Sequence, residues 1–91
     1  MVTAIIMLSV EKKHINQVAE KLAAIDGLSE VYSVSGSYDI AAIARVQTND
    51  QLSELVTKHL AQIDYILKTE TMLAFQAYSK HDLEGMFSVG V

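Results

Sequence analysis

The sequence predicts a single α+β domain in which strands and helices follow the order β-α-β-β-α-β. Two observations lead to this class. The chain has 91 residues, which is enough for one small domain. Along it, the spacing of apolar residues switches repeatedly between the period of a strand and the period of a helix. A hydrophobic share of 51% and the absence of proline exclude a disordered segment.

The first strand and the first helix occupy the N-terminal part of the chain. Val2–Val10 is apolar at odd and at even positions, as expected of a central strand that is covered on both faces. In Glu11–Ile25 the apolar residues recur with helical spacing and polar residues lie between them, which predicts an amphipathic helix. Asp26-Gly27 ends this helix, because glycine readily adopts the left-handed conformation that follows a helix C-terminus.

A hairpin and a second helix follow. Leu28–Ser35 and Tyr38–Val46 have strand patterns, and Ser35-Gly36-Ser37 supplies the turn between them. Thr48 is expected to cap the second helix, with Gln51 as the last position of a capping box. The apolar stripe of this helix consists of Leu52, Leu55, Val56, His59, Leu60 and Ile63.

The chain then returns to a strand and ends in a tail. Ile66–Tyr78 predicts a long last strand. Ser79–Asp82 predicts the cap of a short tail helix, which we expect to dock across a subunit boundary. The expected division is therefore a domain at 1–78 and a C-terminal tail at 79–91. The apolar face of the tail consists of Leu83, Met86 and Phe87.

This order matches the ferredoxin-like fold, a four-stranded antiparallel sheet with two helices on one face. The helices cover one face only, yet the strands are apolar on both faces. A second copy of the chain is the simplest cover for the remaining face. The sequence therefore predicts a face-to-face homodimer, which is a dimeric α/β barrel.

Charge and composition restrict the function. The chain carries 7 Lys and Arg against 11 Asp and Glu, a formal net charge of −4, and it has no cysteine. An acidic surface repels nucleic-acid phosphates, and the missing thiols exclude disulfides and thiolate metal ligands. The apolar runs are shorter than the roughly 18 residues of a membrane span, and no basic leader precedes the first strand. We expect a cytoplasmic protein with no membrane contact and no direct contact with nucleic acid.

No pattern in the sequence predicts catalysis. The three histidines, His14, His59 and His81, lie far apart and lack the spacing of metal ligands. His59 falls at the edge of the helical stripe, where a core-edge position is the simpler interpretation. The four glycines form no phosphate-binding loop. We therefore expect no enzyme, with no catalytic residue, no metal site and no cofactor.

One stretch has the composition of a small-ligand site. The turn at Gly36 and Ser37 lets backbone N–H groups point outward, where they can bind a carboxylate. Asp39 offers a negative charge for an ammonium group, and Tyr38 is placed to cover the ligand. Together these groups suit a zwitterion. The alternative is an ordinary hairpin in which Asp39 accepts hydrogen bonds within the turn.

Two threonines of the last strand are a second candidate. Thr69 and Thr71 are two residues apart, so their hydroxyls lie on the same side of a strand. Two hydroxyls on one side can bind a carboxylate. Threonine is also a common strand residue, so the pattern by itself is more simply explained by a plain strand.

Three segments carry a resemblance to a known family. They are Asp26–Val31 before the second strand, the glycine-to-aspartate stretch Val34–Ile40, and Thr69–Phe75 in the last strand. The chain resembles the C-terminal sensor domain of the Lrp/AsnC (feast/famine) regulators, known as the RAM domain. The resemblance extends from Val2 to Tyr78.

The resemblance implies an effector-binding and oligomerisation module. Such domains form dimers through their sheets and assemble further, for example into octamers, and small effectors, usually amino acids, bind at contacts between dimers. Full regulators of the family also carry a helix-turn-helix, which is missing here. We therefore expect a stand-alone sensor module linked to transcription regulation, with a full-length regulator as a candidate partner. The residues that would line the effector pocket are Gly36, Ser37, Tyr38, Asp39, Thr69 and Thr71.

Three alternatives remain at this point. The first is a pure protein-interaction module with an empty pocket. The second is a monooxygenase-type enzyme, which the dimeric α/β barrel also supports and which would need a haem-binding histidine or a polar catalytic cluster inside the barrel. The third is an ACT-type amino-acid-binding domain, although Ser9–Lys12 lacks the glycine that such domains usually place after their first strand.

Overall fold

Strands and helices alternate in the expected order in this computed structural model, which describes residues 1–78 and 80. The expected ferredoxin-like βαββαβ fold is confirmed. The strands are β1 (Val2–Val10), β2 (Leu28–Ser33), β3 (Ile40–Val46) and β4 (Ile66–Leu73). The helices are α1 (Ile15–Ala23), after a 3₁₀ turn at Lys12–His14, and α2 (Asn49–Glu54), which continues as a π turn at Leu55–His59 and a 3₁₀ turn at Leu60–Gln62.

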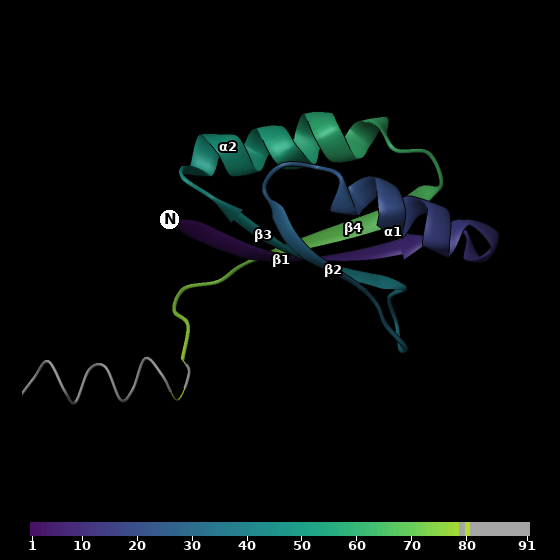
Figure 1. Cartoon of the computed structure of the whole chain (residues 1–91), viewed down its shortest axis with the longest axis horizontal. Helices are drawn as coiled ribbons and strands as arrows, with labels where there is room; N and C mark the ends of the chain where they lie inside the picture. Colours follow the sequence, from purple (N-terminus) through teal and green to yellow (C-terminus); the bar gives the residue numbers. More distant parts are fainter. Residues whose placement is uncertain (79, 81–91) are drawn as a thin grey trace, which may run out of the picture.

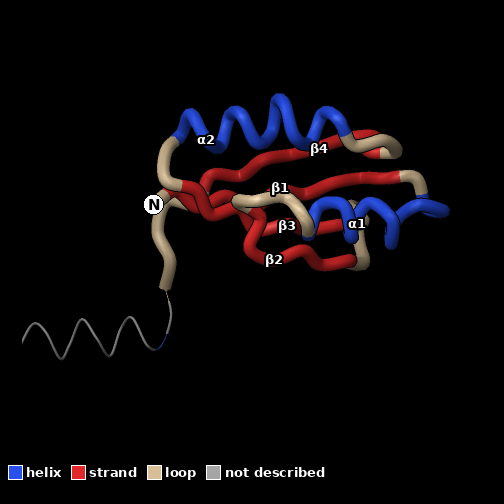
Figure 2. The backbone as a smooth tube through the Cα atoms, turned by 45° about the horizontal axis from the view of Figure 1, so that its top comes forward, coloured by secondary structure: helices blue, strands red, loops and turns tan. Residues whose placement is uncertain are grey.

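The four strands form one antiparallel sheet in the order β2-β3-β1-β4. Both helices lie on the same face of this sheet, as Figures 1 and 2 show. We call this side the helix face and the opposite side the open face. β1 and β3 are central, while β2 and β4 are the edge strands. An antiparallel pair carries opposite residues on the same face, so the strand register assigns every strand residue to one face or the other.

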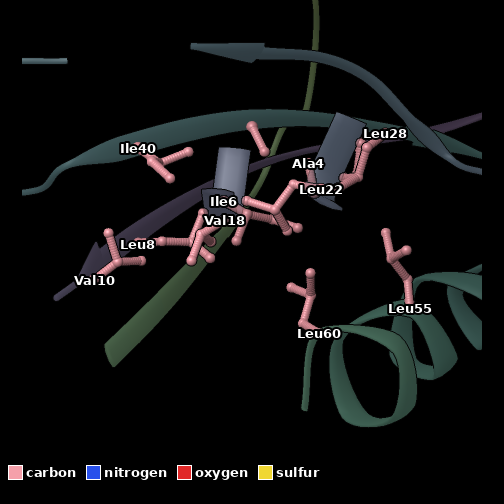
Figure 3. Packing of buried hydrophobic residues seen from close by; sticks show 12 residues of the cluster. Ala4, Ile6, Leu8, Val10, Val18, Leu22, Leu28, Ile40, Leu55 and Leu60 are labelled. Atoms are coloured by element: carbon pink, nitrogen blue, oxygen red, sulfur yellow. The ribbon is translucent and has the colours of Figure 1, made fainter. Parts of the chain in front are cut away.

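The core lies between the helices and the helix face. Alternate residues of β1 are fully buried there, including Ile6 and Leu8. Figure 3 shows Val18 and Leu22 of α1 packed against them, and it shows Leu55 pointing inward from the α2 segment. Burying a side chain of this size contributes about 1.5–3 kcal/mol before the entropy of ordering is subtracted. The sequence pattern that predicted a buried face on each helix is confirmed.

The helices agree with the sequence prediction at the Thr48 cap and differ from it in their bounds and in the exposure of His59. The Thr48 hydroxyl accepts the Gln51 N–H at 3.1 Å, as expected. Gly27 has the expected left-handed φ of +99°, but α1 already ends at Ala23, so this glycine lies in the turn before β2 and does not end the helix. The expected single helix over 11–25 is instead a 3₁₀ turn followed by α1. His59, expected at the edge of the core, is exposed, because the stripe reaches the core through neighbours such as Leu60.

The last strand is shorter than the sequence predicts. β4 ends at Leu73 instead of Tyr78, near the start of β1, which has only Val2 and Thr3 beyond the partner of Leu73. Leu73 lies opposite Ala4, and the Ala74 N–H donates a final hydrogen bond to the Thr3 carbonyl at 2.9 Å. After this point the chain leaves the sheet near the N-terminus (Figure 1). The Ser79–Asp82 cap and the tail helix predicted after it lie outside the described residues, apart from Lys80.

Among the described residues, no helix is long and apolar enough to cross a membrane.

Candidate functional site

The hairpin that joins β2 to β3 is fixed at its base and open at its tip. At the base, the Val34 N–H donates to the Asp39 carbonyl and the Asp39 N–H donates to the Leu8 carbonyl, both at 2.9 Å. At the tip, Gly36 has φ +114°, a conformation that favours glycine, and Ser37 is exposed. A side chain placed at Gly36 would meet no atom within 4 Å. The tip is therefore accessible to a ligand.

Asp39 holds this hairpin to the central strand β1. Its Oδ2 atom accepts the backbone N–H of Val10 at 2.9 Å in a partly buried setting. Leu8 is the last residue of β1 that pairs with β3, and the Asp39 carboxylate satisfies the N–H of Val10 just beyond the end of this ladder. One carboxylate oxygen is therefore already engaged by the protein itself. The sequence anticipated hydrogen bonds within the turn, whereas the partner is a strand 29 residues earlier.

Tyr38 connects the same hairpin to the edge strand β4. Its hydroxyl donates to Glu70 Oε2 at 2.5 Å, and the Nζ atom of Lys68 lies 5.8 Å from the centre of its ring. A cation at this distance from an aromatic ring is attracted to it. The hydrogen bond to Glu70, followed by desolvation and the negative charge of Glu70, raises the pKa of the Tyr38 phenol above its usual value.

Glu70 and Lys68 were not among the residues that the sequence singled out. Strand alternation places both on the face opposite Thr69 and Thr71, and this could have been read from the sequence. The approach of Tyr38 to Glu70 could not, because 32 residues separate them. The structure therefore adds two charged side chains beside the predicted hairpin site.

The two threonines lie on the other side of the sheet from Tyr38. Thr69 is opposite Leu8 and Thr71 is opposite Ile6, and both partners point into the core on the helix face. Thr69 lines a cavity of about 200 Å³ beside the α2 segment. The hairpin residues from Gly36 to Asp39 thus lie together, while Thr69 and Thr71 are separated from them by the sheet. Within one chain the six predicted residues do not form a single pocket.

The open face has an apolar centre and a polar end. The strand register shows this. Met72 of β4 is opposite Ile5, which is itself opposite Ile43 on β3. Toward the other end of β4, Glu70 is opposite Met7 and Lys68 is opposite Ser9. The polar end is therefore the end at which the hairpin leaves the sheet. The apolar centre consists of Ile5, Met7, Ala41, Ile43 and Met72, which no described element covers.

No group of three His, Asp or Glu side chains within the described residues could hold a metal ion. A cavity of about 320 Å³ lies between the α2 segment and the turn that precedes β2. Asp26, Gln51, Glu54 and His59 line it, but their side chains do not converge on a shared hydrogen-bond partner. It therefore offers less than the hairpin as a site.

A known family profile and curated protein sequences match most of this chain. The sequence profile of the Lrp/AsnC ligand binding domain matches residues 3–83. YugG of Bacillus subtilis, an uncharacterised HTH-type transcriptional regulator, is 30% identical over 84 residues, which cover 89% of this chain and 50% of YugG. A second such regulator, PF0250 of Pyrococcus furiosus, is 34% identical over 59 residues, which cover 65% of this chain and 39% of that protein. The chain thus spans about half or less of the length of these relatives.

Solved structures show the same architecture. The crystal structure of TTHA0845 from Thermus thermophilus superposes with a TM-score of 0.82 at 32% identity, covering 88% of this chain and all of that one (100%). AsnC of E. coli superposes with a TM-score of 0.80 at 25% identity, covering 86% of this chain and 53% of AsnC. The residues matched by the family profile include the hairpin, the threonine strand and the turn before β2, and they confirm the resemblance noted in the sequence. The chain belongs to the Lrp/AsnC ligand-binding domain family.

Proposed function

We propose that this domain is a small-molecule sensing and oligomerisation module whose effector is a free amino acid. Its family is regulatory, and its curated relatives are HTH-type transcriptional regulators. One regulator with the same fold, NMB0573 of Neisseria meningitidis, was crystallised in complex with L-Met, although it is only 15% identical to this chain. The accessible hairpin tip, with N–H groups that can bind a carboxylate, supports the same class of ligand here.

The observation that carries this proposal is the separation of the two halves of the predicted site. The hairpin from Gly36 to Asp39 and the pair Thr69 and Thr71 lie on different sides of one sheet. A pocket that uses both halves must take the hairpin from one copy and the threonines from another. The effector would then bind only where two copies meet, so that binding favours assembly.

Assembly itself is supported by the open face. Its apolar centre includes Met72, which is 43% exposed, and Ile5, which lies opposite it on β1. Apolar side chains grouped on an otherwise polar surface mark an interaction site. We propose that two copies pack these faces together as a dimer, burying about 800 Å² on each partner. Pairs of dimers would then bring hairpins and threonines together.

The link to transcription is proposed to be indirect. A net charge of −4 gives little attraction to DNA phosphates. A full-length regulator of the same family is therefore the proposed partner through which an effector signal would reach DNA. Sequence-specific binding of this chain to DNA in a gel shift at physiological salt would contradict this part of the proposal.

A thermal-shift screen of the common L-amino acids tests the sensing function. A ligand present at about one hundred times its Kd should add roughly 2.7 kcal/mol of apparent stability. Replacing Thr69 and Thr71 together by Val should remove this gain, because Val keeps the shape but lacks the hydroxyl. Thr57→Val on the α2 segment is the matched control and should leave the gain intact. The absence of any hit for the unmodified chain would favour the interaction-module alternative.

Mixing two defective variants tests whether the site is shared between copies. One variant lacks the threonine hydroxyls, and the other carries Tyr38→Ala in the hairpin. If each pocket uses residues of two chains, some pockets in a mixed oligomer contain both intact halves, and part of the ligand response returns. If each chain holds its own pocket, every pocket stays defective and the mixture shows no response. The second result would overturn the shared site.

A further inference from the structure

We infer that Glu70 and Lys68 on the open face of β4 are the charged contacts of the hairpin half of the site, Glu70 for the ligand's ammonium group and Lys68 for its carboxylate. The hydroxyl of Tyr38 donates to Glu70, and its ring centre lies 5.8 Å from Lys68 Nζ. This inference rests on the proposed amino-acid sensing and identifies which side chains recognise the zwitterion. It gives Asp39 a structural role instead of a ligand contact.

The hydrogen bond of Asp39 is the first reason. Asp39 is partly buried and its Oδ2 atom accepts the Val10 N–H, so an ammonium group could reach only the remaining oxygen of a carboxylate that is held against the core strand. Glu70 is exposed and in contact with the same hairpin through Tyr38. It can bind an ammonium group without breaking the β1–hairpin connection.

The spare bonding capacity of Glu70 and Lys68 is the second reason. A carboxylate has two acceptor oxygens, and only Oε2 of Glu70 is used within the described residues. Lys68 has three N–H donors, and in that same part of the chain it has no ion-pair partner. Its ammonium group instead lies near the Tyr38 ring. Both charges are therefore available to a ligand.

The spacing of these two residues fits an α-amino acid. Residues two positions apart on one strand face lie roughly 6.8 Å apart along the strand. Charge-assisted hydrogen bonds span about 2.7–2.9 Å each. Ammonium and carboxylate groups that share one carbon atom can therefore bridge Glu70 and Lys68. Neutral amines or simple carboxylates would satisfy only one of the two.

The surroundings favour a ligand with an apolar side chain. Glu70 lies level with Met7 on the open face, and Met72 is the next residue of β4 on that face. A ligand held by its charged groups at the polar end would place its side chain toward these apolar residues. Since β4 is an edge strand, the cluster stays at the margin of the open face when a second copy covers the centre.

Binding measurements on charge-neutral variants test this assignment. The amino acid that gives the largest thermal shift is titrated calorimetrically into the wild type, Glu70→Gln and Lys68→Met. Each variant should bind it at least about tenfold more weakly, as expected when a charge-assisted hydrogen bond is lost. Glu54→Gln and Lys58→Met are the matched controls, because this exposed ion pair, 3.6 Å apart on the α2 segment, undergoes the same charge changes. The controls should bind as the wild type does.

Ligand analogues separate direct contact from an indirect effect. The analogue without the amino group should bind Glu70→Gln and the wild type equally, since the contact that the substitution removes is already missing. The analogue without the carboxylate should bind Lys68→Met and the wild type equally. If either variant weakens its analogue as much as the amino acid, the residue acts by holding the hairpin and the assignment is wrong. Light scattering on each variant records whether assembly has changed.

The outcomes also separate this inference from the proposed function. If the wild type binds an amino acid and both variants bind it equally well, Glu70 and Lys68 are not contacts, while the sensing function stands. If the wild type binds none of the amino acids, the proposed function fails and the assignment fails with it.

Discussion

At the scale of single residues, the Asp39 carboxylate is a candidate ligand contact in the sequence and a hydrogen-bond acceptor for the backbone in the structure. The sequence places a carboxylate next to a glycine turn, which suggests a contact for an ammonium group. In the structure this carboxylate accepts the N–H of Val10, a residue that is only 2% exposed at the end of β1. The bond satisfies a backbone N–H that lies just beyond the last β1 residue paired with β3.

This contact predicts a difference between two substitutions of Asp39. Asp39→Ala leaves the Val10 N–H without an acceptor and should lower the free energy of unfolding by about 1–3 kcal/mol. Asp39→Asn keeps an acceptor oxygen and should lower it less. Urea unfolding measures both, and Asp64→Ala, at an exposed turn residue, serves as the control. Equal stability of Asp39→Ala and the control would show that the bond contributes nothing.

Tyr38 provides a prediction about pH. Its hydrogen bond to Glu70 raises its pKa in the folded state above the ordinary value of about 10. A raised pKa means that the bond contributes stability below about pH 10 and that this contribution is lost as the pH rises through the folded-state pKa. The stability difference between the wild type and Tyr38→Phe should therefore be constant in the neutral range and shrink in alkali.

Absorbance of the tyrosinate ion measures the same effect directly. The difference between the titration curves of the wild type and Tyr38→Phe isolates the Tyr38 phenol. Its midpoint should lie above pH 10 and move down in Glu70→Gln, because the charged acceptor is gone. A midpoint that Glu70→Gln leaves unchanged would contradict the contact.

At the scale of elements, each of the two turns that lead from a helix into a strand contains a residue with positive φ. Gly27 before β2 has φ +99° and Tyr65 before β4 has φ +75°. Glycine adopts this conformation easily, whereas a tyrosine is strained by it. Tyr65 is held by a ring stack with His14, whose centroid is 3.7 Å away, and its carbonyl accepts the Glu11 N–H at 3.0 Å. Contacts to the segment that follows β1 thus offset the strain.

The two left-handed glycines predict unequal costs on substitution by alanine. Both positions would be strained by about 1–2 kcal/mol, because both have positive φ. At Gly27 the new Cβ would also meet Val46 Cγ1 at 3.2 Å, whereas at Gly36 it would meet nothing within 4 Å. Gly27→Ala should therefore lower the free energy of unfolding more than Gly36→Ala in the same urea titration. Equal losses would show that Val46 moves aside without cost.

At the scale of the whole molecule, the open face is the surface through which the chain is proposed to form a dimer. Helices cover one side of the sheet (Figure 2). On the other side no described element covers Ile5, Ile43 and Met72. A layer of apolar side chains with no second layer is an incomplete version of this architecture. The proposed dimer completes it.

A charge placed in the centre of the open face should prevent assembly without unfolding the chain. Ile43→Glu introduces a carboxylate that a face-to-face dimer would have to bury without a partner, which is strongly unfavourable. Light scattering should report a monomer for this variant, with circular dichroism similar to that of the wild type. Ala61→Glu, at an exposed position of the α2 segment, is the control and should keep the wild-type size. If Ile43→Glu also keeps that size, the open face is not the interface.

The sequence alone determined the order of elements, the burial of both central strands, the glycine turn at Gly27 and the helix cap at Thr48. Each of these depends on periodicity or on residues a few positions apart, which a linear pattern contains. The sequence also located the hairpin and the threonine strand. It overestimated the length of β4, because the end of that strand depends on where β1 has residues to pair with.

Only the tertiary structure decided which residues act together at the candidate site. Asp39 meets Val10 across 29 positions and Tyr38 meets Glu70 across 32, so no local spacing contains either contact. The ladder between β1 and β4 places Thr69 and Thr71 on the helix face, and a shift of one residue would have placed them on the open face. Register is fixed by long-range packing of the apolar faces. The division of the site between two sides of the sheet therefore became apparent only in the folded chain.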